Sequence, residues 1–581
     1  MNKIPYGLSN FEKIRTENYA DVDKTRFIEQ IENENKEYHF FIRPRKFGKS
    51  LFLSMLFHYY DLCAAHNFDK LFGDLYIGKN PTPKRNSYFV VRFSFSGINT
   101  MSVEKFESSF GSKIEASVLE FLVHYNEYID PDEYKTSKLQ LLESKGEIGV
   151  NAIEKYVFKI VNENKGKLFV IIDEYDHFAN DLIALGTNLS RKQYKELIWA
   201  NGVVRDFYET LKDNSQTIVD KIFITGITPM MLDDVTSGFN ISNNLSTDVR
   251  YNDTLGFTED EVERLIDECG IDRSKMTIDR KFMYNGYLFH PDAENKLYNS
   301  AMILYLLDKI QNISGKLDNI IDDNLKTDYG RIEQLLNKTE NVKNLEYIIE
   351  YGKTYAKVVN RFSINKIHEP KNFLSLLYYM GLVTIEKDEE TGSAMLAIPN
   401  YSVKTMYWEY MENIIAERNP EMIVDHNVIM TGLRAFTFRG EYNQFFEDFH
   451  KNFVSKISNR DLENFSEKNV KFLLLSIWFQ TGYYIPISEI ENSDGYIDIY
   501  LQRRDYLYPK ITTDWILEIK YIKQSEAKNK RLFASKKKDA ITQLQRYKSS
   551  NLFKDRTDVR YLAVVFTGKT KFWIEELVVS H

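Results

Sequence analysis

At 581 residues the chain is too long for one hydrophobic core, so its length predicts two to four domains. Hydrophobic residues make up 43% and charged residues 28%, which is typical of a folded chain and excludes a disordered one. No apolar run has the length of a signal peptide or a membrane span, so we expect a cytoplasmic protein without a membrane partner. Two cysteines, Cys63 and Cys269, exclude a disulfide framework and a cysteine-based zinc site within one chain.

The net charge of -8 argues against a uniformly basic surface. Between Lys510 and Arg560, however, fourteen Lys or Arg residues stand against six Asp or Glu residues. This local excess is compatible with a surface that faces phosphates and equally with a lysine-rich helical face exposed to solvent.

From about residue 37 to residue 229, short apolar runs alternate with helical stretches, which predicts a three-layer α/β fold with a largely parallel sheet. The predicted strands are residues 38–44, 88–95, 167–175 and 221–227. Residues 260–335 are predicted to be helical. Residues 361–402 then give a helix, NFLSLLYYMGL, and two short strands, VTIEKD and AMLAIPN, in the order of a winged helix.

A second α/β region begins near residue 427. Two helices, GEYNQFFEDFHKNF and EKNVKFLLLSIWFQ, precede three strands, GYIDIYLQR, WILEIKYI and RYLAVVFTG, and a further helix interrupts the strands. The chain is therefore multidomain α/β, and we expect domains at residues 1–258, 259–425 and 426–581.

The segment FFIRPRKFGKSLFLSML runs from an apolar strand through Gly48-Lys49-Ser50 into an amphipathic helix, which is the context of a phosphate-binding P-loop. Lys49 would reach the β and γ phosphates of ATP, and the Ser50 hydroxyl would bind Mg²⁺. Arg43 stands where the usual pattern has its first glycine. The predicted nucleotide contacts are Arg43, Pro44, Arg45, Lys46, Phe47, Gly48, Lys49, Ser50 and Leu51.

Downstream, KLFVIIDEYD places two carboxylates at the end of a buried strand. We assign Asp173 to the metal and Glu174 to the attacking water. Thr225 or Thr228, after the next strand, would sense the γ phosphate. Three arginines are equal candidates for an arginine finger: Arg205, Arg250 and Arg264. The competing interpretations are a chance GKS tripeptide and a site that binds nucleotide without rapid turnover.

These motifs resemble the AAA-ATPase-like family of prokaryotic proteins. The resemblance is carried by NYADVDKTRFIEQIENENKEYHFFIRPRKFGKSLFLSML, IIDEYD, FITGIT, GFNISNNLSTD, GFTEDEV, YNGYLF and IPN, and it covers most of residues 1–405. The family loop reads R-P-R-[RK]-F-G-K-S, so Arg43 belongs to the family pattern. The resemblance implies an AAA-like P-loop ATPase core with an appended helical and winged segment.

Near the C-terminus, DGYIDIYLQRRDYLYPKITTDWILEIKYIK supplies Asp498 on one strand and Glu518-Ile519-Lys520 on the next. Alternate residues of a strand share a face, so Glu518 and Lys520 point the same way while Ile519 points into the core. Two carboxylates there would hold Mg²⁺ or Mn²⁺ in preference to zinc. Lys520 would orient the attacking water or stabilise developing negative charge. The competing interpretation is a strand face with a salt bridge.

This arrangement resembles the PD-(D/E)XK phosphodiesterase superfamily. The resemblance adds Glu467, an upstream acidic residue that commonly completes the metal site. It also adds Gln543, a polar residue on the helix after the catalytic strand.

The sequence thus predicts an ATP-binding and ATP-hydrolysing P-loop protein fused to a Mg²⁺- or Mn²⁺-dependent endo- or exonuclease that acts on DNA, with ATP regulating or driving cleavage. By analogy we expect a possible homo-oligomer, and a role in defence against foreign DNA or in handling mobile elements. One alternative is a nucleotide-controlled switch or scaffold whose C-terminal domain binds nucleic acid or protein without cutting. Another is an ATPase with a degenerate nuclease domain.

Overall fold

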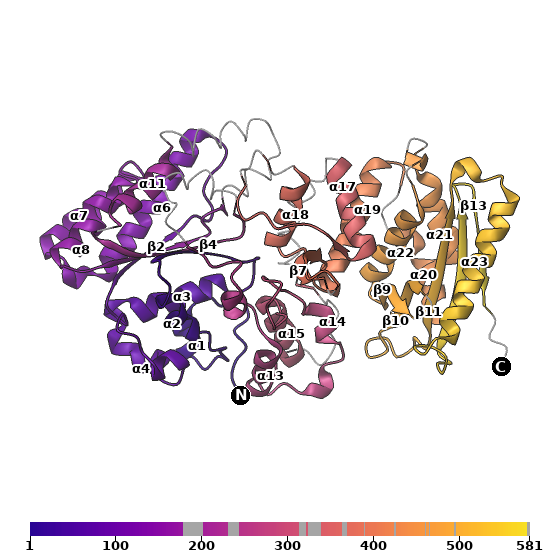
Figure 1. Cartoon of the computed structure of the whole chain (residues 1–581), viewed down its shortest axis with the longest axis horizontal. Coiled ribbons are helices and arrows are strands. Elements are labelled where there is room, and N and C mark those ends of the chain that lie inside the picture. The colour runs from indigo at the N-terminus through magenta and orange to yellow at the C-terminus, as the bar shows by residue number, and fades with distance from the viewer. Residues whose placement is uncertain are drawn as a thin grey trace. The chain divides into compact units, whose positions relative to one another are not determined.

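A computed structural model describes most of the chain, in two compact units: the described residues up to Asn400 and those from Tyr401 onward (Figure 1). The predicted domain boundaries at residues 258 and 425 remain predictions. The described residues are 1–177, 202–215, 217–229, 243–312, 321–322, 339–362, 366, 369–388, 390–422, 426–458, 461–463, 465–492 and 495–577. Parts of two predicted segments, residues 313–320 with 323–335 and residues 238–242, lie outside them.

The first unit is built on a five-stranded parallel sheet, which confirms the predicted fold class. The strand order is β2 (Phe89–Ser94), β3 (Leu168–Asp173), β4 (Val219–Gly226), β1 (Tyr38–Ile42) and β5 (Asn243–Asn244). All four predicted strands are present. The sequence did not indicate β5, because two polar residues carry no strand pattern.

Helices cover both faces of this sheet (Figure 1). On one face, Phe52 of α3 (Lys49–Tyr60) packs against Phe41 and Phe223. On the other, Phe207 of α11 (Val203–Asp213) packs against Phe93 and Phe95, beside α6 (Val103–His124). The remaining helices of this part are α1 (Phe11–Thr16), α2 (Arg26–Glu32), α4 (Phe68–Phe72), α5 (Tyr76–Lys79), α7 (Pro131–Ser144) and α8 (Lys159–Glu163).

The rest of the first unit is mainly helical, as predicted. Its helices are α13 (Glu259–Glu268), α14 (Arg280–Tyr284), α15 (Ser300–Asn312), α17 (Thr339–Tyr351) and α18 (Pro370–Tyr379). After α18, β7 (Thr384–Lys387) and β8 (Ala394–Ala397) form an antiparallel pair, and β6 (Lys353–Thr354) extends it. The helix-then-hairpin order is therefore present, while the winged-helix identity stays a prediction.

The second unit contains a mixed five-stranded sheet. Its order is β13 (Lys571–Glu576), β12 (Val559–Thr567), β11 (Asp514–Ile522), β10 (Gly495–Arg503) and β9 (Tyr484–Asn492). Only β11 and β12 pair in parallel. The helices are α19 (Tyr401–Arg418), α20 (Met430–Arg439), α21 (Asn443–Asn452), α22 (Glu467–Thr481) and α23 (Lys530–Ser549). Among the helices that the structure describes, none combines the length and apolar character that a membrane crossing requires.

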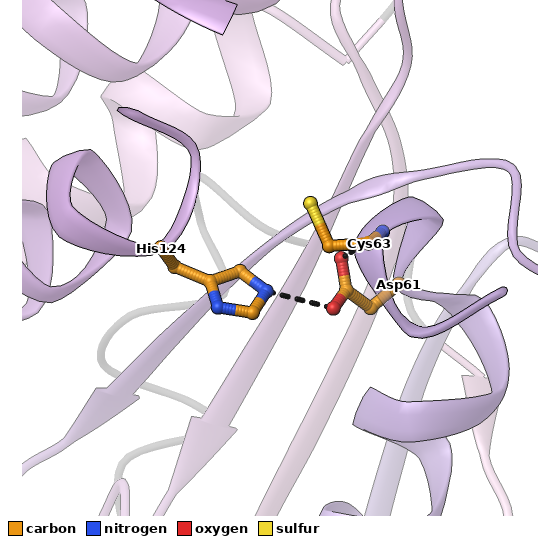
Figure 2. Close-up of side chains that lie close together, drawn as sticks. All are labelled: Asp61, Cys63 and His124. Carbon is orange, nitrogen blue, oxygen red and sulfur yellow. Dashed lines mark hydrogen bonds and ion pairs between the residues drawn. The ribbon is translucent and has the colours of Figure 1, made fainter. Parts of the chain in front are cut away.

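Asp61 lies directly after α3, and its carboxylate points toward His124 and the backbone of Cys63 (Figure 2). Its buried carboxylate accepts hydrogen bonds from the Cys63 amide (3.1 Å), His124 Nε2 (2.7 Å) and the Tyr125 hydroxyl (2.7 Å). That hydroxyl accepts in turn from the amide of Val90 on β2 (2.8 Å). Burial and Asp61 raise the pKa of the Cys63 thiol to about 11. Both oxygens of the Asp61 carboxylate therefore accept hydrogen bonds from protein donors.

Replacing Asp61 should destabilise the first unit. Asp61→Ala leaves a buried tyrosine hydroxyl, a helix-start amide and a histidine without their acceptor, so we expect a loss of about 2–4 kcal/mol of unfolding free energy. Asp61→Asn should lose less, because the amide oxygen still accepts. Calorimetry of the two variants checks the order. Equal stability of wild type and Asp61→Ala would contradict a role of Asp61 in holding the two helices to the sheet.

His39 makes the first unit sensitive to acid. The ring is 2% exposed on β1, and neither of its nitrogens has a hydrogen-bond partner among the described residues. Burial, and secondarily the charge of Lys221, lower the pKa of His39 from 6.5 to about 4. The unfolded chain therefore binds the extra proton first as pH falls, and stability decreases between about pH 6.5 and pH 4.

We expect the titration of His39 to lower the free energy of unfolding by roughly 2 kcal/mol between pH 7 and pH 5. His39→Phe removes the titrating group and should abolish this part of the loss. Hydrogen exchange of the β1 amides, compared between wild type and variant at each pH, measures it. A variant as acid-sensitive as wild type would refute the assignment.

Candidate functional site

Three carbonyls of the loop between β1 and α3 accept hydrogen bonds from the segment that follows the sheet. The Arg45 carbonyl accepts from Asn299 Nδ2 (3.2 Å), the Lys46 carbonyl from the Ala301 amide (3.1 Å) and the Phe47 carbonyl from the Gly256 amide (3.1 Å). Lys46 (φ 66°) and Gly48 (φ 95°) adopt left-handed conformations, and Gly48 caps α3. Backbone of this kind, at a helix N-terminus, forms a concave set of amides suited to an anion.

Lys49 lies across this loop. Its side chain is buried, and Nζ donates to the carbonyls of Arg43 and Pro44, each at 2.9 Å. Burial lowers the pKa of Lys49 to about 8, against the opposing effect of Asp173 and other nearby carboxylates. The Lys49 ammonium therefore lies where it would reach phosphates bound by the loop.

Asp173 at the end of β3 connects the loop helix to the next strand. One carboxylate oxygen accepts from the Ser50 hydroxyl and the other from the Thr225 hydroxyl, both at 2.7 Å. Thr228 instead donates to the buried Asp176 (2.6 Å). Of the two threonines considered from the sequence, the structure brings Thr225 to Asp173 and holds Thr228 on Asp176.

Glu174 has a strained backbone. Its φ of 51° is uncommon for a residue other than glycine, and such strain is most often retained at functional positions. Burial, and then the charge of Asp173, raise the pKa of Glu174, while His177, Arg45 and Lys49 oppose the shift. A carboxylate held beside Asp173 with a raised pKa has the properties of a proton acceptor.

The Arg43 side chain anchors the loop to the backbone at Ser246 and Tyr251. Its guanidinium is 1% exposed and donates to the carbonyls of Ile42 (3.0 Å), Ser246 (2.6 Å) and Tyr251 (2.9 Å). It also lies over the rings of Phe41 and Phe289, at 4.4 and 3.9 Å from their centroids. These contacts commit the side chain to the protein, so only the backbone of Arg43 remains for a nucleotide contact.

The three arginine-finger candidates pair elsewhere. Arg205 contacts Glu209 (2.7 Å), Arg250 contacts Asp248 (2.6 Å) and Glu34 (2.7 Å), and Arg264 Nε donates to the Asp260 carbonyl (3.3 Å). None of these contacts places one of the three arginines at Asp173.

Arg43→Met should test whether the guanidinium anchors the loop. We expect a loss of about 2–4 kcal/mol of stability, because three buried carbonyls lose their donor, together with weaker binding of a fluorescent ATP analogue. Lys49→Met is the matched comparison: it removes the donor of two carbonyls together with a buried ammonium, so we expect a smaller loss of stability and weaker ATP binding. A stable Arg43→Met protein that has lost only ATP binding would show instead a direct phosphate contact.

In the second unit, Asp498 and Glu518 face each other where two strands separate. The β10–β11 ladder pairs Ile499 to Leu501 with Leu517 to Trp515 and ends there. Beyond it, Asp498 Oδ2 accepts from the Ile519 amide at 2.9 Å, so the carboxylate takes the place of a ladder partner. The diverging strands thus leave two acidic side chains on one face with space between their backbones.

Lys520 lies among three carboxylates. Its Nζ is 2.5 Å from Glu518 Oε1, 3.7 Å from Glu467 Oε1 and 4.0 Å from Asp498 Oδ2. Burial, and then repulsion from Asp498, raise the pKa of Glu518. Glu467 is the first residue of α22, and its other oxygen accepts from the Tyr521 amide at 3.3 Å. The structure therefore brings together four of the five predicted nuclease residues.

Gln543 lies on α23, beside Leu544, which packs onto the sheet. Its Oε1 is buried and has no hydrogen-bond partner among the described residues. Nothing in the described contacts links it to the carboxylates, so its role stays a prediction.

The sequence reasoning missed Lys471. Its Nζ is 3.0 Å from Asp498 Oδ1. The available signal was its spacing, because Lys471 lies four residues after Glu467 and therefore on the same face of α22.

The donor set fits a divalent metal of the Mg²⁺ type. Glu518 is 1% exposed, yet its Oε2 has no hydrogen-bond partner among the described residues. Asp498 and Glu467 add further hard oxygen ligands. An orphaned buried carboxylate oxygen beside other carboxylates is what a cation would satisfy.

Comparison with known proteins finds two families within the chain. Residues 5–236 match the family described as "Predicted AAA-ATPase", and residues 465–576 match the PD-(D/E)XK nuclease superfamily. A curated relative, "Uncharacterized protein in vnfD 5'region" from Azotobacter chroococcum mcd 1, is 27% identical over 310 residues, which are 53% of this chain and 52% of the relative. The chain thus spans about half the length of that relative. The matched ranges contain the loop with Asp173 and the carboxylate cluster respectively.

Proposed function

Because the chain joins a region of the AAA-ATPase-like family to a domain of the PD-(D/E)XK nuclease superfamily, we propose that it is a metal-dependent DNA nuclease controlled by ATP binding and hydrolysis. The observation that carries this proposal is the convergence of Glu467, Asp498 and Glu518 within 4.0 Å of the Lys520 ammonium. Separate elements supply these groups, and a solvated strand face does not need such a gathering of buried charge.

Each residue of the cluster has a chemical task in phosphodiester cleavage. Asp498, Glu518 and Glu467 would hold the divalent metal, whose chemistry is to lower the pKa of a bound water and to neutralise charge on the scissile phosphate. Lys520, held on Glu518, would orient the attacking water or stabilise the negative charge that develops. Gln543 would contact the substrate or water from α23.

A basic surface beside this cluster supports a nucleic-acid substrate. Between Lys523 and Lys538 the chain has seven Lys or Arg residues and one Glu. Lys537 is paired with Glu575 and lies over the Trp573 ring. The other six make no ion pair with any described residue: Lys523, Lys528, Lys530, Arg531, Lys536 and Lys538. Lys523 directly follows β11, so this basic segment begins three residues after Lys520.

The first unit would act as the ATP-dependent control. The loop from Arg43 to Leu51 would hold the phosphates, with Lys49 on the β and γ groups and Ser50 with Asp173 on Mg²⁺. Glu174 would polarise water and Thr225 would sense the γ phosphate. We also propose that the chain self-associates and that a second copy supplies the arginine finger. The contacts given above for Arg205, Arg250 and Arg264 do not place any of them at Asp173.

The central test is cleavage of linear, circular and single-stranded DNA with Mg²⁺ or Mn²⁺, with and without ATP. Glu518→Gln should lower the cleavage rate by at least about 100-fold, because a metal ligand is lost, and should leave ATP hydrolysis intact. Lys49→Ala should abolish ATP hydrolysis and the effect of ATP on cleavage. Glu526→Gln, an exposed glutamate close by, is the charge-matched control and should cut as wild type does.

Two results would reject the nuclease. Cleavage that survives Glu518→Gln would come from elsewhere. Intact ATP hydrolysis and metal-independent DNA binding without cleavage would support the switch or scaffold in its place.

A further inference from the structure

Lys471 occupies a distinctive place beside the carboxylate cluster. It projects from α22, one helical turn after Glu467, and its side chain is 15% exposed against 12% for Asp498. Its ammonium lies 3.0 Å from Asp498 Oδ1. The other oxygen of Asp498 is fixed by the Ile519 amide (2.9 Å) and lies 4.0 Å from Lys520. Lys471 therefore holds the Asp498 oxygen that the strand backbone does not use.

The two lysines of the cluster have different surroundings. Lys520 lies on the central strand β11, 2.5 Å from Glu518 and within 4.0 Å of Glu467 and Asp498. Lys471 reaches Asp498 from a neighbouring helix, on a flexible four-carbon stem. Lys471 thus contacts Asp498 at Oδ1, whereas Lys520 approaches Oδ2.

Charge also distinguishes the states of the site. Glu467, Asp498 and Glu518 with Lys471 and Lys520 leave one net negative charge when all are ionised. A bound dication makes the site net positive by one, which matches a phosphodiester anion. The Lys471 ammonium and the dication are both positive and would both bind Asp498 Oδ1, so they exclude each other from this oxygen.

We propose that Lys471 is an internal counter-ion of the metal site, which holds Asp498 Oδ1 until a divalent cation takes that oxygen and then turns its ammonium to the substrate phosphate. The inference rests on the proposed function for the metal site and the phosphate substrate. In this role Lys471 keeps Asp498 compensated before metal binds, and it is a positioning residue until substrate arrives.

Calorimetric titration of the full chain with Mn²⁺, without nucleic acid or nucleotide, tests the competition. Lys471→Gln removes the competing ammonium, so we expect Mn²⁺ to bind the nuclease site about threefold to tenfold more tightly. Lys471→Arg keeps the charge and should stay near wild type. Lys456→Gln, an exposed lysine of the same unit, is the charge-matched control and should not change the affinity. Glu518→Gln identifies the nuclease site, because its binding heat should disappear.

The same variants separate the inference from the proposed function. Lys471→Gln should reach half-maximal cleavage at lower Mn²⁺ but with a reduced maximal rate. Unchanged or weaker Mn²⁺ affinity in a folded Lys471→Gln protein, with circular dichroism as in wild type, overturns the inference and leaves the nuclease standing. Tighter Mn²⁺ binding without cleavage in any variant supports the counter-ion and rejects the nuclease. Absence of Mn²⁺ binding in both wild type and Lys471→Gln overturns the inference.

Discussion

A buried carboxylate must be matched by donors or by a cation, and this constraint organises both units. Asp61 is matched by an amide, a histidine and a tyrosine hydroxyl, and so joins two helices to the parallel sheet. Asp176 is matched by the amide and hydroxyl of Thr228. Both are saturated and serve the architecture. The carboxylates whose oxygens the protein does not fully satisfy are the ones that could bind a metal or accept a proton.

The two candidate sites meet the constraint differently. Asp173 is matched by neutral hydroxyls, from Ser50 and Thr225, so a cation can approach without displacing a charged group. Asp498 and Glu518 are matched by ammonium groups at 3.0 and 2.5 Å. A metal that binds there competes with positive charge already in place. We therefore expect the ammonium groups to lower the affinity of the second site for a metal, and so to raise the metal concentration at which it fills.

The elements that the sequence predicted best are those with strong local patterns. The four apolar strands of the first sheet and the three central strands of the second have continuous buried runs, and the structure confirms them. Glu518 and Lys520 follow from strand alternation alone, whereas Glu467 came only from resemblance, because nothing local ties a helix start to a strand 50 residues later. Lys471 was missed although it follows Glu467 by one helical turn, because its partner Asp498 lies on another element. The edge strand β6 and the short β5 were missed because pairing, and not composition, creates them.

The position of Arg43 shows what local motif reasoning cannot supply. By motif, it replaces a glycine beside the phosphates; in the fold, its guanidinium binds carbonyls at Ser246 and Tyr251, about 200 residues away. Phe47 packs on Tyr287 and Phe289, and the outer carbonyls of the loop bind Asn299 and Ala301. The loop is thus held by the helical segment that follows the sheet. We therefore expect a change that nucleotide binding causes in this loop to pass into that segment, because the two share buried hydrogen bonds and ring contacts.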